Sequence, residues 1–353
     1  MKITYLNKKT LKKIIPFLFV FFCLIIFIIY IYNIKPSGVV HHFKINGLMA
    51  TEIDLHIIAD KNLNVEKIKN GLIVELKRME KIFSSYDPNS ELSYVNQKAF
   101  ETNLPISIDL YRVIRHSLSY GQRSSGLFDI TIQPLIKLWD VTNKKNNKMP
   151  SKKAIQYVLS FVDYRNIRLK EGNIMFLKKN ISIDLGGISK GYIIDRAIDY
   201  LKNNGINNAL LNIGGDLYAL GKKHNSLKWN IGIKNPRIEN NPMPIITSIS
   251  AENQSIATSG DYERFRMSKN GVKLHHILNP RTGYPATKSI STTIIAPTAM
   301  QADVVATIVF IMGPVDGLHF IEKEKSVEGM IIYEENGKIK LAMSTGFSSY
   351  INQ

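Results

Sequence analysis

The sequence predicts an α+β protein. Stretches with apolar residues at helical spacing alternate with short β-branched runs, several of them paired as hairpins around glycine. The chain has 353 residues, of which 44% are hydrophobic and 21% are charged, and this is enough apolar sequence to build a large core. Neither an internal repeat nor a shift in composition marks a domain boundary after residue 40. We therefore expect a single domain over residues 43–353.

An uncharged apolar segment, residues 14–34, precedes this domain and is long enough to span the hydrocarbon core of a membrane. Five lysines lie before it, and no small-residue cleavage site follows it. By the positive-inside rule the lysines stay in the cytoplasm and the chain after about Lys35 lies outside it. We expect a cytoplasmic tail at 1–13, an uncleaved signal anchor at 14–34 that crosses the membrane once, and a linker at 35–42.

The only cysteine, Cys23, lies inside the apolar segment. The domain itself therefore has no intramolecular disulfide, no cysteine metal site and no thiol nucleophile. Lipidation of Cys23 is the alternative to a helical anchor, but Phe21 and Phe22 are bulky where a lipidation signal needs small residues. The net charge of +17 fits an anionic ligand or an anionic membrane surface. Because no arginine-rich cluster with interleaved aromatics occurs, a nucleic-acid partner is not expected.

Periodicity and turn residues place the regular elements of the domain. Helices are expected at Val65–Phe83, Asp109–Ser124 and Ala154–Val162, and a turn-rich loop at Ser84–Glu91. The expected strands are a pair within Phe43–Ala59, a pair within Ile167–Ile183, and single strands at Ala209–Ile213, Trp229–Lys234 and Ser248–Ala251, with a proline-rich loop at Asn235–Pro244.

The most informative stretch is Ile183–Asp195, where a strand meets a helix. Asn180–Leu185 alternates polar and apolar residues as a strand does, and the apolar positions of Ile193–Leu201 recur at helical spacing. Two adjacent glycines, Gly186 and Gly187, separate these elements. Glycines at such a turn let the backbone approach a ligand closely, and the first turn of a helix offers free N–H groups to an anion.

Opposite charges stand on either side of that turn, Asp184 before it and Lys190 after it. The stretch is neither the dinucleotide fingerprint nor a P-loop, because the spacing G-x-G-x-x-G and the ending G-K-[ST] are both missing. It is a candidate phosphate site. The alternative is a structural turn followed by a surface lysine.

A second candidate is a helix that begins after Thr298 and ends at Gly313. Nearly every position from Ala302 onward is apolar, so this helix is expected to be buried, yet Asp303 and Thr307 stand one turn apart on one face. A buried carboxylate is costly unless it is paired or holds a cation, and carboxylate and hydroxyl oxygens are ligands that Mg²⁺ accepts. The alternative is an Asp favoured by the helix dipole and a Thr bonded to its own helix.

Several other polar residues could belong to a functional site or could be structural. Because adjacent residues of a strand point to opposite faces, only one of His275 and His276 can face a site, and His276 is a candidate general base or a structural histidine. Tyr86 could stack on a planar ligand or cover the core. Asp129 and Asp216 are expected to be loop or cap carboxylates.

Eight short stretches of the domain follow one another in a specific order: Met49–Thr51, Ser85–Leu92, Gly126–Thr131, Asp184–Tyr192, Asn212–Asp216, Ala257–Tyr262, His276–Gly283 and Ala302–Thr307. Together they closely resemble the ApbE family, the FAD:protein FMN transferases, over about residues 45–350. The resemblance implies an ApbE-type, T-fold-like catalytic domain of two lobes with FAD between them, behind the single N-terminal transmembrane helix.

The resemblance further implies an activity. Enzymes of this family bind FAD as substrate, use Mg²⁺ to polarise its diphosphate, and move the FMN half onto a Ser or Thr hydroxyl of a target protein while AMP leaves. The implied acceptor carries a flavinylation motif and is a subunit of a membrane redox complex or an extracytoplasmic flavoprotein. The implied location is the bacterial cytoplasmic membrane, with the catalytic domain on the periplasmic side.

Individual roles carry over by position. The metal ligands are the side chains of Asp303 and Thr307 and the backbone oxygen of Gly187, and His276 matches a proposed general base. The positions that match FAD contacts are Met49, Tyr86, Leu127, Phe128, Asp129, Asp184, Lys190 and Ile277. We expect the Gly187 oxygen, the Asp303 carboxylate and the Thr307 hydroxyl to converge within reach of one cation.

Two features of the chain depart from the family pattern. Many relatives are lipoproteins, whereas this chain is expected to be anchored by a helix; and Asn279 stands where the family usually has Asp, which removes a charge near the site. Two other functions remain open: a metal-dependent FAD pyrophosphatase that releases FMN and AMP, and an FAD-binding protein without turnover. Phosphoryl transfer needs positioning and charge neutralisation more than a protein nucleophile, and the sequence offers no nucleophile.

Overall fold

A computed structural model describes residues 21–25, 38–143, 148–223, 227–237 and 243–352. The tail predicted at 1–13 lies outside these residues, as does the anchor predicted at 14–34 except for 21–25. Within the described ranges, no helix has both the length and the apolar character that a membrane crossing requires. The first strand begins at Val39, inside the stretch predicted to be a linker.

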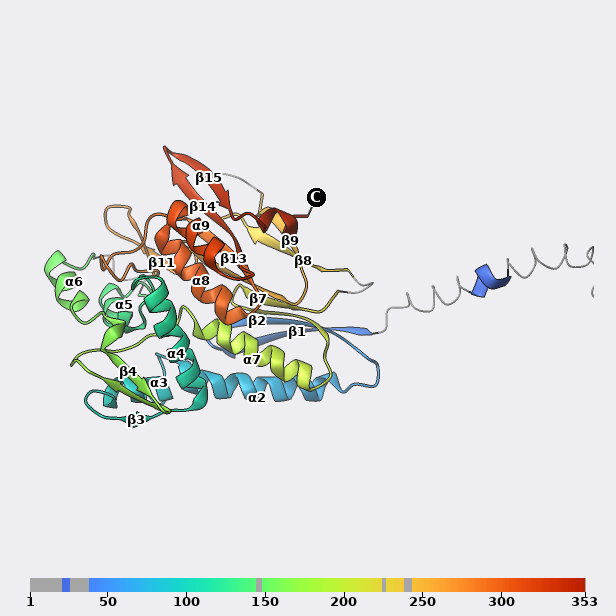
Figure 1. The fold of residues 1–353 in the computed structure, drawn as a ribbon, viewed down its shortest axis with the longest axis horizontal. Helices are drawn as coiled ribbons and strands as arrows, with labels where there is room; N and C mark the ends of the chain where they lie inside the picture. Colours follow the sequence, from blue (N-terminus) through green and yellow to red (C-terminus); the bar gives the residue numbers. More distant parts are fainter. Residues whose placement is uncertain (1–20, 26–37, 144–147, 224–226, 238–242, 353) are drawn as a thin grey trace, which may run out of the picture.

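An antiparallel sheet of eight strands forms the centre of the molecule, in the order β1-β2-β6-β7-β10-β13-β14-β15 (Figure 1). Its strands are β1 (Val39–Leu48), β2 (Thr51–Ala59), β6 (Asn208–Ile213), β7 (Asp216–Leu220), β10 (Gln254–Gly260), β13 (Ser291–Ala296), β14 (Glu328–Glu335) and β15 (Lys338–Met343).

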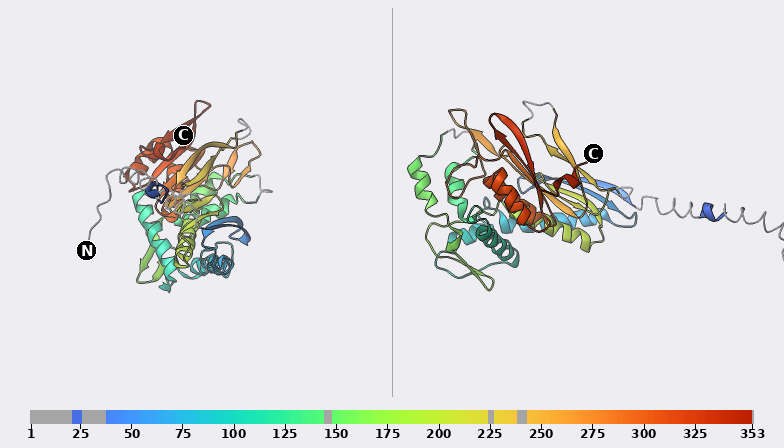
Figure 2. Two further views of the ribbon diagram at one scale, coloured as in Figure 1. Left: turned by 90° about the vertical axis from the view of Figure 1, so that its right-hand side faces the viewer. Right: turned by 45° about the horizontal axis from the view of Figure 1, so that its top comes forward.

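Helices cover one face of this sheet, as both views in Figure 2 confirm. They are α2 (Val65–Phe83), α7 (Ser189–Asn203), α8 (Ala299–Met312) and α9 (Pro314–Lys323). The largest hydrophobic cluster lies between the helices and the sheet, and α8 is buried at ten of its fourteen positions because it packs on β10 and β13 at the centre.

A smaller hydrophobic cluster lies on the opposite face, under the hairpin of β8 (Trp229–Lys234) and β9 (Ile245–Ala251) and the 3₁₀ turn Phe347–Tyr350. Strand β13 lies between the two clusters: Ile294 faces the helices and Ile295 faces the hairpin. All six residues of β13 are therefore buried, which explains a run without the polar alternation of a half-exposed strand.

The remaining elements gather at one end of the sheet (Figure 1). They are α3 (Glu91–Lys98), α4 (Ile108–Arg123), α5 (Gln133–Trp139), α6 (Lys152–Leu159), the three-stranded sheet of β3 (Leu104–Pro105), β5 (Asn173–Phe176) and β4 (Ile167–Lys170), the hairpin of β11 (Phe265–Met267) and β12 (Lys273–His275), and the 3₁₀ turns Ile130–Ile132 and Tyr164–Asn166. The main cluster continues into α3 and α4, so both groups share one core.

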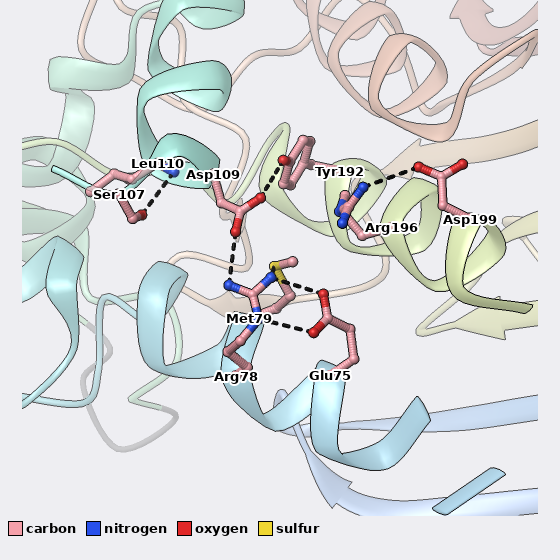
Figure 3. Close-up of polar contacts among 9 residues, drawn as sticks. All are labelled: Glu75, Arg78, Met79, Ser107, Asp109, Leu110, Tyr192, Arg196 and Asp199. Atoms are coloured by element: carbon pink, nitrogen blue, oxygen red, sulfur yellow. Dashed lines mark hydrogen bonds and ion pairs between the residues drawn. The ribbon is translucent and has the colours of Figure 1, made fainter. Parts of the chain in front are cut away.

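A polar network ties three of these helices together (Figure 3). The buried carboxylate of Asp109, in the first turn of α4, accepts hydrogen bonds from Tyr192 Oη of α7 at 2.6 Å and from Arg78 Nη1 of α2 at 2.8 Å. Arg78 also forms a bidentate pair with Glu75 of its own helix, at 2.9 and 2.8 Å. The network fixes α2, α4 and α7 relative to one another beside the core.

Most expected elements are present, with shifted ends. The mixed α and β composition is confirmed, as are the strand pair within Phe43–Ala59, the helix Val65–Phe83 and the helix between Thr298 and Gly313. The strand expected at Asn180–Leu185 is wrong: this segment is extended but joins no ladder, and Asp184 N instead donates to the Ile130 carbonyl at 2.8 Å. The hairpin expected to reach Ile183 ends at Phe176 for the same reason.

Candidate functional site

The first turn of α7 packs directly on the start of α8. A Cβ on Gly191 would lie 2.2 Å from the Ala299 carbonyl oxygen, so only glycine allows the two backbones to come this close. The Asp195 carboxylate completes the contact, because it accepts hydrogen bonds from the N–H groups of Ala299 at 2.7 Å and Met300 at 2.9 Å. Helix α8 therefore begins at a position that α7 determines.

Two contacts at this junction involve residues predicted to bind a metal. The N–H group of Gly191 donates to Asp303 Oδ2 at 2.9 Å, and Asp303 is only 6% exposed. One turn farther along α8, Thr307 Oγ1 lies 3.3 Å from the position that a Cβ on Gly187 would take. Gly187 and Thr307 are thus neighbours, and the first turn of α7, which follows Gly187, contacts Asp303.

A partly buried ion pair adjoins the junction. Lys190 Nζ lies 2.7 Å from Asp216 Oδ2, and the Asp216 side chain is almost completely buried at the start of β7. Burial alone would lower the pKa of Lys190, but Asp216 and Asp303 oppose it and raise the pKa overall. Burial raises the pKa of Asp303, Asp216 adds to this effect, and Lys190 opposes it. Lys190 therefore lies near two carboxylates, and Arg264 adds a second positive charge that also opposes the rise in the pKa of Asp303.

The burial of the Asp303 carboxylate, which raises its pKa, is the observation that tests whether a cation fits. A bound cation would stabilise the ionised form of such a carboxylate. It would therefore lower the pKa of Asp303, whereas the neighbouring Asp216 raises it. The nearby donors are a carboxylate, a hydroxyl and the backbone of a glycine turn, and these oxygen ligands suit Mg²⁺ rather than a softer metal. Asp303, Thr307 and Gly187 therefore fit the metal that the resemblance implies.

His276 lies beside this charged group, following β12. Its Nδ1 atom and its backbone N–H both contact the Arg264 carbonyl at 3.1 Å, so Nδ1 donates and Nε2 keeps its lone pair. Burial lowers the pKa of His276 to about 3, with Arg264 and Lys190 contributing. The ring is neutral at neutral pH. His275 points to the other side, where its Nε2 contacts the Ala286 carbonyl at 2.7 Å, as alternation on a strand predicts.

An apolar surface borders the site. Leu127 packs on the buried cluster of Ile277, Ala286, Phe310 and Ile311, which joins the loop after His276 to α8. Phe128 Cε2 lies 3.2 Å from the position of a Cβ on Gly187. Two of the predicted FAD-contacting residues, Leu127 and Ile277, therefore pack on α8, and a third, Phe128, lies beside the Gly187 turn.

The carboxylate of Asp129 is used inside the fold. Its Oδ1 accepts from Thr131 N at 2.8 Å and Thr131 Oγ1 at 2.6 Å, and its Oδ2 accepts from Tyr164 N at 2.8 Å. This agrees with the interpretation of Asp129 as a cap carboxylate, and leaves its backbone as the part available to a ligand. Asp184 also accepts from its own turn, with Gly186 N at 2.8 Å from its Oδ1.

Two predicted FAD contacts lie farther out. Met49, in the turn between β1 and β2, has a positive φ of 53° and donates its N–H to Glu80 Oε1 at 2.7 Å. The adjacent Thr51 contacts Gly214, next to the turn that leads to Asp216, and this contact links Met49 to the charged group. Tyr86 is 73% exposed in the loop before α3 and makes its backbone hydrogen bond to Ser84 Oγ, so the structure does not bring its ring to the others.

Sequence reasoning alone missed three contributors to this site. Asp216 was interpreted as a loop or cap carboxylate, but it pairs with Lys190. Arg264 positions His276 through its carbonyl, a backbone contact that no side-chain pattern reveals. The role of Gly191 is visible only once α8 packs against it, although a glycine four residues after Gly187, within a stretch of helical spacing, was a usable signal.

Sequence comparison places these features among known proteins. The model of the ApbE family matches residues 49–331. Proteins named FAD:protein FMN transferase from Treponema pallidum and Escherichia coli K12 are 28% and 27% identical to the chain, over 74% and 81% of it and 75% and 82% of their own lengths. A protein of the same name from Buchnera aphidicola is 32% identical over 67% of this chain and 70% of its own.

Structural comparison agrees with the sequence match. The flavin transferase ApbE from Vibrio cholerae superposes with a TM-score of 0.81 at 23% identity, and covers 89% of this chain and 99% of its own. The ApbE protein of Thermotoga maritima superposes with a TM-score of 0.80 at 29% identity, and covers 89% of this chain and 100% of its own. Because the family match spans most of the domain, including every candidate metal ligand, this chain belongs to the ApbE family.

Proposed function

We propose that the chain transfers FMN from FAD to a Ser or Thr hydroxyl of a target protein, with Mg²⁺ as the metal. The observation that carries the proposal is the junction of the Gly187 turn with α8, where Asp303, Thr307 and the pair of Lys190 and Asp216 meet. The names of the curated relatives support flavin transfer to proteins as the activity.

The acceptor hydroxyl oxygen attacks the FMN phosphorus of FAD, the bond between that phosphorus and the bridging oxygen breaks, and AMP leaves with the bridging oxygen. Mg²⁺ bound at Asp303 and Thr307 would neutralise negative charge on the diphosphate. Lys190 carries a second positive charge to the same place, and Asp216 holds its ammonium group in position. Leu127 and Ile277 exclude water from the neighbouring apolar surface.

His276 takes the proton of the acceptor hydroxyl on Nε2, because Nδ1 is engaged with the Arg264 carbonyl. A histidine with a pKa of about 3 is neutral but only weakly basic. An anionic diphosphate nearby raises the basicity of the ring, so His276 becomes an effective base when FAD is bound.

The extracytoplasmic location belongs to the same proposal. The apolar segment 14–34 would anchor the catalytic domain on the periplasmic side of the bacterial cytoplasmic membrane. Acceptors would then be flavin-carrying subunits of membrane redox complexes, or extracytoplasmic flavoproteins, that present a Ser/Thr motif.

The test incubates the full chain with FAD, Mg²⁺ and a peptide that carries a flavinylation motif. We expect the peptide to gain the mass of FMN and AMP to appear in equal amount, and chelation of Mg²⁺ to stop both. Asp303→Asn should lower the rate by about a hundredfold or more, because it removes the buried charge that faces the cation. Glu324→Gln is the matched control: this carboxylate is also buried but pairs with Arg123, outside the site.

The same measurement separates the alternatives. AMP and free FMN without a labelled peptide would overturn the transferase and identify an FAD pyrophosphatase. FAD that binds but is not consumed by the wild type, with or without Mg²⁺, would identify a binding protein without turnover.

A further inference from the structure

A second group of ligand-type side chains lies on the hairpin of β1 and β2, outside the proposed flavin site. His42 of β1 and His56 of β2 are directly paired across the two strands. Asp54 precedes His56 by two positions, so the three side chains extend from the same face of the hairpin. The imidazole rings are stacked, with centroids 4.1 Å apart and planes within 9° of parallel.

The ligand atoms converge. Asp54 Oδ1 lies 2.6 Å from His42 Nε2 and 3.4 Å from His56 Nε2, and the three atoms all lie within 4.8 Å of one another. In a tetrahedral zinc site with bonds of about 2.0–2.1 Å, neighbouring ligand atoms are about 3.3 Å apart. The spacing observed here brackets that value, so small rotations of the side chains would place all three ligands around one ion.

This group is independent of the Asp303 site. Ile53, Leu55 and Ile57 alternate with Asp54 and His56 along β2 and point into the main core, so the histidines lie on the opposite, solvent-facing side of the sheet. The exposed fractions of the His42, His56 and Asp54 side chains are 45%, 35% and 31%, which leaves water access to the remaining coordination positions.

The chemistry of the three ligands selects the type of metal. Two imidazoles and one carboxylate match transition metals such as Zn²⁺, whereas Mg²⁺ prefers oxygen ligands alone. A histidine must be neutral to bind a metal.

We propose that His42, Asp54 and His56 form a binding site for a transition-metal dication of the zinc type on the outer face of the β1–β2 hairpin. Water completes the coordination. β1 is the edge strand of the large sheet and pairs only with β2 among the described strands. An ion bound to side chains of both strands would therefore stabilise the pairing of β1 with β2.

The test uses the full chain, stripped with a chelator and then held in excess Mg²⁺ so that the Asp303 site is not open to a second metal. Co²⁺ serves as the spectroscopic probe and is titrated to follow its visible absorption. We expect one Co²⁺ per chain with the intense bands of four- or five-coordinate cobalt, displaced by an equivalent of Zn²⁺. His42→Ala and His56→Ala should each weaken binding by at least about tenfold, and Asp54→Asn should do so as well.

His41→Ala is the matched control, because His41 neighbours the site in sequence but lies on the other face of β1 and stacks on Phe43. It should bind Co²⁺ as the wild type does. Absence of the bands in the wild type, or equal affinity in His41→Ala and His42→Ala, would overturn the proposal. Circular dichroism of each variant establishes that it is folded, and His42, as the most exposed of the three, is the substitution least able to disturb the core.

A second readout does not depend on spectroscopy. Zn²⁺ that binds only the folded chain should raise the midpoint of thermal unfolding in proportion to the logarithm of its concentration. The rise should disappear in His42→Ala and His56→Ala and persist in His41→Ala. A midpoint that responds to Zn²⁺ equally in all three variants would place the ion elsewhere.

Discussion

Gly187 lies in the turn before α7 and Gly191 in the first turn of α7, and a methyl group would meet different neighbours at each. At Gly191 it would lie 2.2 Å from the backbone oxygen of Ala299, which cannot move without α8. We predict that Gly191→Ala forces α7 and α8 apart and lowers the free energy of unfolding by about 1–3 kcal/mol or more. Urea unfolding measures the loss, and an unchanged midpoint would contradict the contact.

At Gly187 the same methyl group would lie 3.2 Å from Phe128 Cε2 and 3.3 Å from Thr307 Oγ1, both in side chains that can move slightly. Gly187→Ala should therefore change the free energy of unfolding by less than about 1 kcal/mol. It should raise the Mg²⁺ concentration needed for half-maximal FMN transfer, because it displaces the Thr307 hydroxyl. A variant with wild-type Mg²⁺ dependence would show that Gly187 is only a packing residue.

Among the elements, α2, α4 and α7 are joined through Asp109 (Figure 3). Burial alone would raise the pKa of Asp109, but the hydrogen bonds from Tyr192 and Arg78 outweigh it and lower the pKa overall. A carboxylate whose pKa is lowered on folding stabilises the fold above its unfolded pKa of about 3.9 and loses that contribution as the pH falls through the folded value.

We predict that Asp109→Asn lowers the free energy of unfolding by about 1–3 kcal/mol at pH 7, because it removes the charge that Arg78 and Tyr192 face. The difference from the wild type should begin to shrink below about pH 4, because the carboxylate of the unfolded chain takes up its proton there, and should vanish only below the lowered pKa of the folded state. Urea unfolding at pH 7 and pH 3.5 measures both values. Asp199→Asn serves as the control, because its pair with Arg196 is 3.2 Å long and largely exposed and should contribute little.

Elements with a strong local signal were predicted well. The sequence marks both ends of helix α8, with the N-cap Thr298 and the C-cap Gly313. Its run of apolar residues correctly predicts that the helix is buried. The segment Asn180–Leu185 has the alternation of a strand, yet it lies where no partner strand is available and bonds instead to the loop at Ile130. Alternation reports which face is buried, whereas a ladder requires a neighbour that only the tertiary fold supplies.

The candidate site follows the same division. Asp303, Thr307 and the glycine turn were found because each is unusual within its own element. The pairing of Lys190 with Asp216, and the support of His276 by Arg264, join elements that are distant in sequence, and no local pattern encodes such contacts. The structure was needed to place them.

At the scale of the whole molecule, the order of the sheet differs strongly from the order of the chain. β1 and β2 form a local hairpin, but the next strand of the sheet is β6, and Ile57 of β2 pairs with Ala209. Contacts between such distant segments slow folding, because a long loop must close before they form. We predict that pulse-labelled hydrogen exchange during refolding finds the amides that link β2 to β6 protected later than those within β8 and β9.

The β8–β9 hairpin is the internal reference in that experiment, since its two strands are close in sequence. Simultaneous protection of both sets of amides would show that the sheet forms in one step and would contradict the predicted order.

The delayed pairing of β2 has a consequence for the nascent chain. β1 and β2 are translated before the other strands of the sheet. Until β6 follows more than a hundred residues later, β2 has both an unpaired backbone edge and an uncovered apolar face formed by Ile53, Leu55 and Ile57. An unpaired apolar strand edge is a template for aggregation. Biogenesis of this protein should therefore depend on a holding chaperone, and the demand should be greatest while β6 is still missing.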